Sequence, residues 1–165
     1  MITLYLDMDG VLADFNKKFA EIKTSEHDHI RFRDAVLQFS IFEDLDFMPD
    51  AHELLNHVAK LKDINVEILT SMGTFDQERG IKAKQQKLHW LKKHNINYKA
   101  NFVRTKTEKA EFAGSTSILI DDSIGCITPF IKHGGHGILH MNASDSIRIL
   151  DATISAIRGL HALRS

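Results

Sequence analysis

The stretch that decides the fold is ITLYLDMDGVL, residues 2–12. Its first five residues form an apolar run that predicts a buried strand, and Asp7, Asp9 and Gly10 follow at its end. Two carboxylates this close repel each other unless a cation or a shared proton relieves the repulsion. The stretch therefore indicates either a functional site at a strand end or a turn whose side chains cap local backbone groups.

Two later apolar runs end in the same way. The run VEIL precedes Thr70-Ser71, and the run SILI precedes Asp121-Asp122. In an open parallel sheet, ligands bind in the crevice outside the carboxyl ends of the strands. One crevice is therefore expected to gather Asp7, Asp9, Thr70, Lys106 or Lys109, Asp121 and Asp122.

Strand-like runs alternate with helical patterns along the chain. The expected strands lie near residues 2–7, 65–70, 101–104, 117–121 and 136–140, and the expected helices near 50–61, 80–94, 124–133 and 143–163. This alternation predicts an α/β fold, with a Rossmann-like parallel sheet of about five strands flanked by helices. In the helix near 80–94, Ile81, Leu88 and Leu91 fit an apolar stripe, which would place Lys84 and Lys87 on a solvated face.

Residues 16–47 interrupt the alternation between the first and second strands. The segment is too long for a simple crossover and carries several phenylalanines in a polar background. We predict a small helical cap inserted after the first strand, within a single domain of 165 residues. Most of these aromatic side chains are expected to pack in the core, and one or two are expected to face a substrate.

Composition limits the range of partners. The net charge of −1 and the lack of a basic stripe disfavour binding to duplex nucleic acid. Apolar runs are far shorter than the ~20 residues that a membrane helix needs, so no membrane contact is expected. The N-terminus shows no signal-peptide pattern, and Cys126 is the only cysteine, with core packing as its expected role. These features favour a cytoplasmic setting.

The ordered motifs resemble the haloacid dehalogenase-like phosphohydrolase superfamily. The stretches DMDGVLADF at 7–15, LTS at 69–71, KLHW at 87–90 and LIDDS at 119–123 look more specifically like the 5'(3')-deoxyribonucleotidases and their phage and bacterial relatives. The resemblance extends from residue 2 to about residue 140. It implies a Mg²⁺-dependent phosphomonoesterase that acts through an aspartyl-phosphate. The implied substrates are small phosphate esters, above all (deoxy)nucleoside monophosphates.

The resemblance also implies roles for the acidic residues. Asp7 is the expected nucleophile, and Asp9 is the expected acid for the leaving group and later the base for water; residue types alone do not decide which aspartate does which. Asp7, the Asp9 carbonyl and Asp121 are the expected Mg²⁺ ligands, with Asp122 holding a metal-bound water or orienting a neighbour. The plain alternative for Asp121-Asp122 is a loop that caps the following helix.

The remaining expected contacts concern the phosphate and the base. Thr70 and Ser71 are expected to bind the phosphate through hydroxyl and backbone N–H groups. Lys109 is expected to neutralise the charge between Asp7 and the phosphate, and Lys106 is the alternative. Phe15 is expected to lie against the nucleobase, or else to brace the cap as a core residue.

Some alternatives stay open at this stage. Two histidine pairs, His27 with His29 and His133 with His136, look motif-like, but a surface loop and a helix end explain them better. Two alternative functions are the hydrolysis of another small phosphoester and the hydrolysis of the phosphorylated end of a nucleic acid. A third alternative is a non-catalytic module that binds metal or phosphate.

Overall fold

The computed structural model describes residues 1–163 and contains one parallel sheet. Its strands are β1 (Ile2–Leu6), β2 (Ile64–Ser71), β3 (Lys99–Val103), β4 (Ser117–Asp121) and β5 (His136–Leu139). All neighbouring pairs are parallel, and the strand order is β3-β2-β1-β4-β5. The predicted Rossmann-like α/β fold is therefore confirmed.

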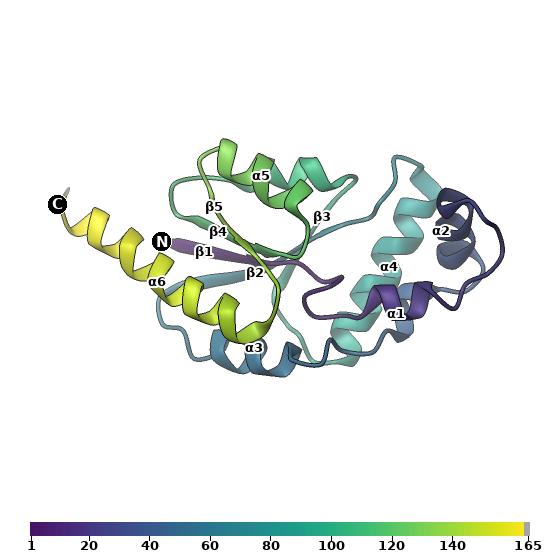
Figure 1. Cartoon of the computed structure of the whole chain (residues 1–165), viewed down its shortest axis with the longest axis horizontal. Coiled ribbons are helices and arrows are strands. Elements are labelled where there is room, and N and C mark those ends of the chain that lie inside the picture. Colours follow the sequence, from purple (N-terminus) through teal and green to yellow (C-terminus); the bar gives the residue numbers. More distant parts are fainter. Residues whose placement is uncertain (164–165) are drawn as a thin grey trace.

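Helices cover both faces of this sheet (Figure 1). They are α1 (Phe15–Phe19), α2 (Asp28–Leu37), α3 (Ala51–Val58), α4 (Gln77–Lys93), α5 (Ile124–Lys132) and α6 (Ala143–Ala162), with the 3-10 helices η1 (Ile41–Asp44) and η2 (Lys106–Phe112). In Figure 1, α5 lies on one side of the sheet, and α3 and α6 lie on the other. No helix in residues 1–163 is long and apolar enough to cross a membrane.

Alternate residues of the central strand β1 are buried, because β2 and β4 flank it and helices cover it, while Thr3 and Tyr5 are half-buried. Leu4 and Leu6 are fully buried, as are Ile118 and Ile120 of β4. A strand covered on both faces reads as a continuous apolar run rather than an alternating one. The rigidity of this strand fixes the position of the acidic residues that follow it.

Helix α4 buries Leu91 as predicted, but the rest of its buried face differs from the predicted stripe. Ile81 is 50% exposed and Leu88 is 42% exposed, whereas Ala83, Lys87 and Trp90 are fully buried. The Trp90 indole N–H donates to the Leu45 carbonyl at 2.8 Å, which ties the helix to the segment between β1 and β2. The prediction that Lys87 lies on a solvated face is therefore wrong.

Two backbone hydrogen bonds join the start and the end of the insert that lies between β1 and α3. The Asp14 N–H donates to the Asp46 carbonyl at 2.8 Å, and the Met48 N–H donates to the Leu12 carbonyl at 2.8 Å. Between these two contacts lie α1, α2 and η1; α2 and η1 pack against α4, and α1 packs against η1. This helical insert therefore stands over the same edge of the sheet as the loop that follows β1 (Figure 1).

Candidate active site

A cavity of about 420 Å³ opens at the carboxyl ends of the strands. The chain passes from β1 outward to β2 and β3, then returns to place β4 on the other side of β1. Such a reversal of strand order is where open α/β sheets bind ligands. The cavity is lined by Asp7, Asp9, Gly10, Phe15, Asn16, Phe32, Phe42, Ser71, Gly73, Thr105, Lys106, Lys109, Asp121, Asp122, Ser123 and Cys126.

A tight turn after β1 sets the position of the first two aspartates. The Met8 carbonyl accepts N–H groups from residues 11, 12 and 13 at 3.2, 2.8 and 2.9 Å. Gly10 has a φ of +82°, and a Cβ at this position would collide with the Asp122 carboxylate. Glycine is therefore required both for the backbone conformation and for the approach of Asp122.

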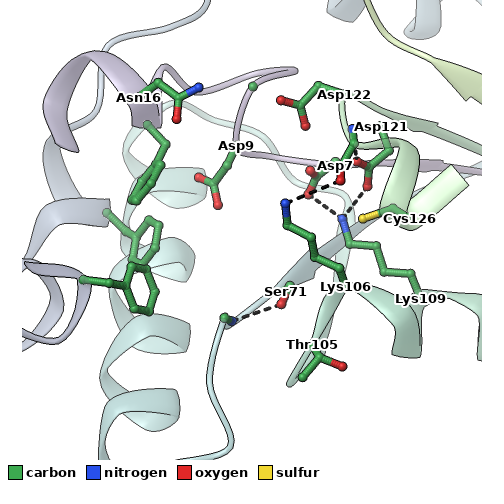
Figure 2. Close-up of a pocket in the computed structure, with 16 residues that line it drawn as sticks. Asp7, Asp9, Asn16, Ser71, Thr105, Lys106, Lys109, Asp121, Asp122 and Cys126 are labelled. Carbon is green, nitrogen blue, oxygen red and sulfur yellow. Dashed lines mark hydrogen bonds and ion pairs between the residues drawn. The ribbon is translucent and has the colours of Figure 1, made fainter. Parts of the chain in front are cut away.

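Lys109 joins the first acidic motif to the second. Its Nζ lies 2.8 Å from Asp7 Oδ1 and donates to Asp121 Oδ2 at 2.6 Å, as Figure 2 shows. The lysine is 1% exposed. Helix η2 holds it there, because the Glu108 carboxylate accepts the Arg104 and Thr105 N–H groups at 2.7 and 3.4 Å and caps the start of that helix.

Three carboxylates converge beside Lys109. Asp7, Asp121 and Asp122 each place an oxygen within 4.8 Å of the others. Burial, with added repulsion from Asp7 and Asp121, raises the pKa of Asp122 to about 6. Burial and the Asp7 charge also raise the pKa of Asp121, against the opposing effect of Lys109. Burial alone would lower the pKa of Lys109, but the charges of Asp7 and Asp121 raise it above its usual value.

This donor set fits a hard divalent cation. Carboxylate oxygens are the ligands that Mg²⁺ and Ca²⁺ prefer, and the cluster of Asp7, Asp121 and Asp122 offers three. The lysine neutralises only part of the negative charge, so burial and the remaining repulsion keep the pKa values of Asp121 and Asp122 raised. A bound cation would relieve the remaining repulsion. The space that Gly10 leaves for Asp122 supports the same fit.

The Asp9 side chain lies apart from this cluster and forms an ion pair with a different lysine, Lys87. Lys87 Nζ donates to Asp9 Oδ2 at 2.6 Å, to Thr70 Oγ1 at 2.7 Å and to the Ser71 carbonyl at 2.8 Å. The other oxygen, Asp9 Oδ1, is buried and has no hydrogen-bond partner among the described residues. Burial raises the pKa of Asp9, although Lys87 acts in the opposite direction.

Only some of the residues predicted to bind phosphate line the cavity. Ser71 lines the cavity, and its hydroxyl accepts the Gly73 N–H at 3.0 Å. Thr70 is fully buried and contacts Lys87 rather than lining the cavity. Lys106 lines the cavity at its exposed side, where its Nζ donates to Ser123 Oγ at 3.4 Å.

Aromatic side chains form the wall opposite the acidic cluster. Phe15 stacks on Phe42 with ring centroids 5.5 Å apart, and Phe32 meets Phe15 edge-on at 6.2 Å. All three line the cavity. Figure 2 shows a group of aromatic rings on the other side of the cavity from the labelled Asp121 and Asp122. The cavity therefore combines an anionic end with an apolar aromatic end.

The histidine pairs lie outside this cavity. His133 Nδ1 is 2.8 Å from the Pro129 carbonyl, and His136 Nε2 is 3.1 Å from the Ser115 carbonyl. The rings of His27 and His29 lie 5.8 Å apart at the start of α2 and are exposed. Cys126 is buried, as predicted for a packing residue, and burial raises the pKa of its thiol to about 12.

Solved structures share this fold. A hydrolase from Streptococcus pneumoniae TIGR4 superposes with a TM-score of 0.52 at 15% sequence identity, over 90% of this chain and 97% of that one. A haloacid dehalogenase-like family hydrolase from the same species gives a TM-score of 0.46 at 13% identity, over 89% of each chain. No protein-family model and no curated protein matches the sequence. The first likeness establishes the fold, which is the one that the motif resemblance implies.

Proposed function

We propose that this protein is a haloacid dehalogenase-type, Mg²⁺-dependent phosphomonoesterase. The observation that carries the proposal is the Lys109 bridge between Asp7 and Asp121, at the point where three carboxylates converge. Phosphoryl transfer needs a nucleophile, an acid for the leaving group and cations that offset charge on the transferring group. Asp7, Asp9 and Lys109 line one cavity and are the residues proposed for these three roles.

The proposed chemistry has two steps. Asp7 attacks phosphorus and forms an acyl-phosphate, while the ester P–O bond breaks and the leaving oxygen takes the proton of Asp9. Water then attacks the same phosphorus and gives its proton to Asp9, which releases inorganic phosphate and restores the Asp7 carboxylate. Lys109 holds Asp7 in place throughout.

Asp7, the Asp9 carbonyl, Asp121 and Asp122 are the residues proposed to hold the ion directly or through water. When bound, a divalent cation supplies electrostatic stabilisation of the charge on the phosphoryl oxygens. Ser71 and the backbone that follows β2 are proposed to contact the phosphate from the other side.

A nucleoside monophosphate is the proposed substrate. A volume of about 420 Å³ falls within the range of small-molecule pockets. Phe15, Phe32 and Phe42 line the same cavity as the acidic cluster, and Figure 2 shows aromatic rings on the side away from Asp121 and Asp122, where the base of a phosphate-bound nucleotide would lie. Stacking on aromatic rings tolerates base identity, so activity on several bases is expected.

Phosphate release from a set of nucleoside monophosphates and from p-nitrophenyl phosphate tests this proposal. Wild-type protein should turn over in Mg²⁺, lose activity in EDTA and recover when Mg²⁺ is added back. Ca²⁺ should support it poorly, because its longer bonds and higher coordination number misplace the nucleophile. Asp7→Asn should fold and fall to near background, because an amide does not form the acyl-phosphate.

The rival functions give different results in the same assay. A phosphatase of nucleic-acid ends would release phosphate from a 5'-phosphorylated oligonucleotide faster than from any mononucleotide. A non-catalytic module would bind Mg²⁺ or phosphate without turnover. Full activity in EDTA, or more than a tenth of wild-type rate in folded Asp7→Asn, would overturn the proposed mechanism.

A further inference from the structure

Lys87 is a buried cation outside the Asp7, Lys109 and Asp121 cluster. It comes from the middle of α4, and its side chain is fully buried. A lysine is almost never fully buried unless it is paired, because removing the ammonium from water is expensive. Its position therefore calls for a specific partner, and the partner is Asp9.

The ammonium of Lys87 has no donor left for a substrate. It carries three N–H groups and contacts three oxygens, those of Asp9, Thr70 and the Ser71 carbonyl, at 2.6–2.8 Å. The ring of Phe42 covers it, with the Nζ 4.5 Å from the ring centroid. A saturated and covered cation acts through the groups that it holds, not by touching the reacting atoms.

The contact makes the two oxygens of Asp9 unequal. Oδ2 accepts from Lys87, whereas Oδ1 has no partner among the described residues. An ammonium only donates hydrogen bonds, so Oδ2 stays an acceptor while this contact lasts. A proton carried by Asp9 then resides on Oδ1.

We propose that Lys87 is a positioning residue that fixes Asp9 with Oδ1 as the proton-carrying oxygen. The proposal rests on the proposed phosphatase function and deepens it. In the first step, the Oδ1 proton passes to the leaving oxygen as its bond to phosphorus breaks and the Asp7–phosphorus bond forms. In the second step, Oδ1 takes a proton from the attacking water. Lys87 keeps its own protons in both steps.

The same contacts connect Asp9 to the helical insert. Phe42, which covers Lys87, belongs to η1 and stacks on Phe15. The neighbouring Gln86 also reaches the insert, because its Nε2 donates to the Val36 carbonyl at 2.8 Å and its Oε1 accepts the Phe42 N–H at 3.4 Å. Gln86 therefore shares the structural role of Lys87 but has no contact to Asp9, which makes it a matched control.

The test is the dependence of kcat/KM on the leaving group. Aryl phosphates with good leaving groups need little protonation, whereas alkyl esters such as nucleoside monophosphates need an acid. Lys87→Met keeps length and removes the charge. It should lower kcat/KM on a nucleoside monophosphate by about 10²–10³-fold, and on p-nitrophenyl phosphate by less than about tenfold. Gln86→Leu should lower both values by the same factor.

A double-mutant cycle locates the effect on Asp9. Asp9→Asn should show the same selective loss, and Lys87→Met added to it should change the kcat/KM ratio of the two substrates no further. Circular dichroism checks folding. If Lys87→Met does not fold, Lys87→Gln retains an amide donor and should show a smaller loss with the same selectivity.

Two results separate this inference from the proposed function. Wild-type protein without phosphatase activity in Mg²⁺ would remove the proposed function and this inference with it. An active wild type whose Lys87 variants lose both substrates equally, or lose neither, would overturn the positioning role alone. Additive losses in the double variant would also overturn it.

Discussion

Replacing Lys109 by methionine tests the electrostatic design of the cavity most directly. Lys109 is 1% exposed, and its Nζ lies 2.8 Å from Asp7 and 2.6 Å from Asp121. Methionine keeps the unbranched stem in its buried channel. What it removes is the charge, which leaves two buried carboxylates facing each other.

The expected loss of stability is large. Removing one partner of a buried ion pair costs about 3–5 kcal/mol, because the remaining charge is buried without compensation. For a protein of this size each kcal/mol corresponds to roughly 2–4 °C, so the Tm of metal-free Lys109→Met should fall by about 6–20 °C at pH 8. Burial already raises the pKa of Asp121, so protonation relieves the variant as pH falls. The Tm difference from wild type should therefore be smaller at pH 5 than at pH 8.

Lys106→Met is the matched control. Lys106 lies one 3-10 turn earlier on the same helix, but it is exposed and contacts Ser123 at 3.4 Å. Its replacement should change stability by less than about 0.5 kcal/mol. Turnover should fall by about 10²–10³-fold in Lys109→Met and clearly less in Lys106→Met. Thermal melts in EDTA at both pH values, with phosphate-release assays in Mg²⁺, decide the matter. An unchanged Tm for Lys109→Met, or a larger activity loss in Lys106→Met, would refute the reasoning.

Three further predictions use other parts of the molecule. Phe15→Ala should lower kcat/KM on nucleoside monophosphates by about 10–100-fold while p-nitrophenyl phosphate turnover stays within about threefold, because stacking is worth about 1–3 kcal/mol per base; equal losses would show that Phe15 only braces the insert. Gly10→Ala should weaken Mg²⁺ binding at least about tenfold by calorimetry, because its Cβ displaces Asp122. Gly159→Ala, where a Cβ meets nothing within 4 Å, is the control, and equal affinities in both would contradict the account. Burial lowers the pKa of His140, so the fold holds its neutral form; the stability that this provides is present above about pH 6.5 and is lost as pH falls. The Tm of His140→Gln should therefore decline less than that of wild type between pH 7.5 and 5.5, and parallel declines would argue against this effect.

The sequence predicted the parallel sheet and the gathering of the aspartates at its strand ends, because strand ends carry strong local signals. An apolar run that stops at Asp7 or Asp121 leaves little choice about where the carboxylate lies once the strands are parallel. Residues 7, 9, 121 and 122 accordingly all line one cavity. The choice between Lys106 and Lys109 was harder, because residues three apart eclipse on a 3-10 helix and both lysines line the cavity. The two lysines differ in burial, since Lys109 is buried and Lys106 is exposed. This difference depends on the packing of η2 against α5.

The face of α4 could not be predicted from hydrophobicity alone. A stripe through Ile81 and Leu88 satisfies the helical period, yet both side chains are partly exposed. The buried stripe instead passes through Ala83, Lys87 and Trp90, and a pattern search that treats every lysine as polar rejects it. The signal that identifies this stripe is Trp90, whose buried indole N–H needs a partner and finds the Leu45 carbonyl.

The burial of Lys87, which the sequence pattern placed on a solvated face, indicates a role in function. A fold without chemistry at Asp9 would gain from apolar residues at both Asp9 and Lys87, since hydrophobic replacement of a whole buried ion pair is often neutral or stabilising. Here α4 instead places the Lys87 ammonium against the ring of Phe42. All three N–H groups of that ammonium donate to oxygens, which belong to Asp9, Thr70 and Ser71. Predictions from the hydrophobic pattern of a helix are expected to fail at functional sites, where a residue is kept for its chemistry. In EDTA, Lys87→Met should lose less stability relative to wild type at pH 5 than at pH 8, because burial raises the pKa of Asp9 and protonation relieves its unpaired charge, while activity on nucleoside monophosphates is largely lost at either pH. A variant that is equally destabilised at both pH values and fully active would show that the lysine serves packing rather than the reaction.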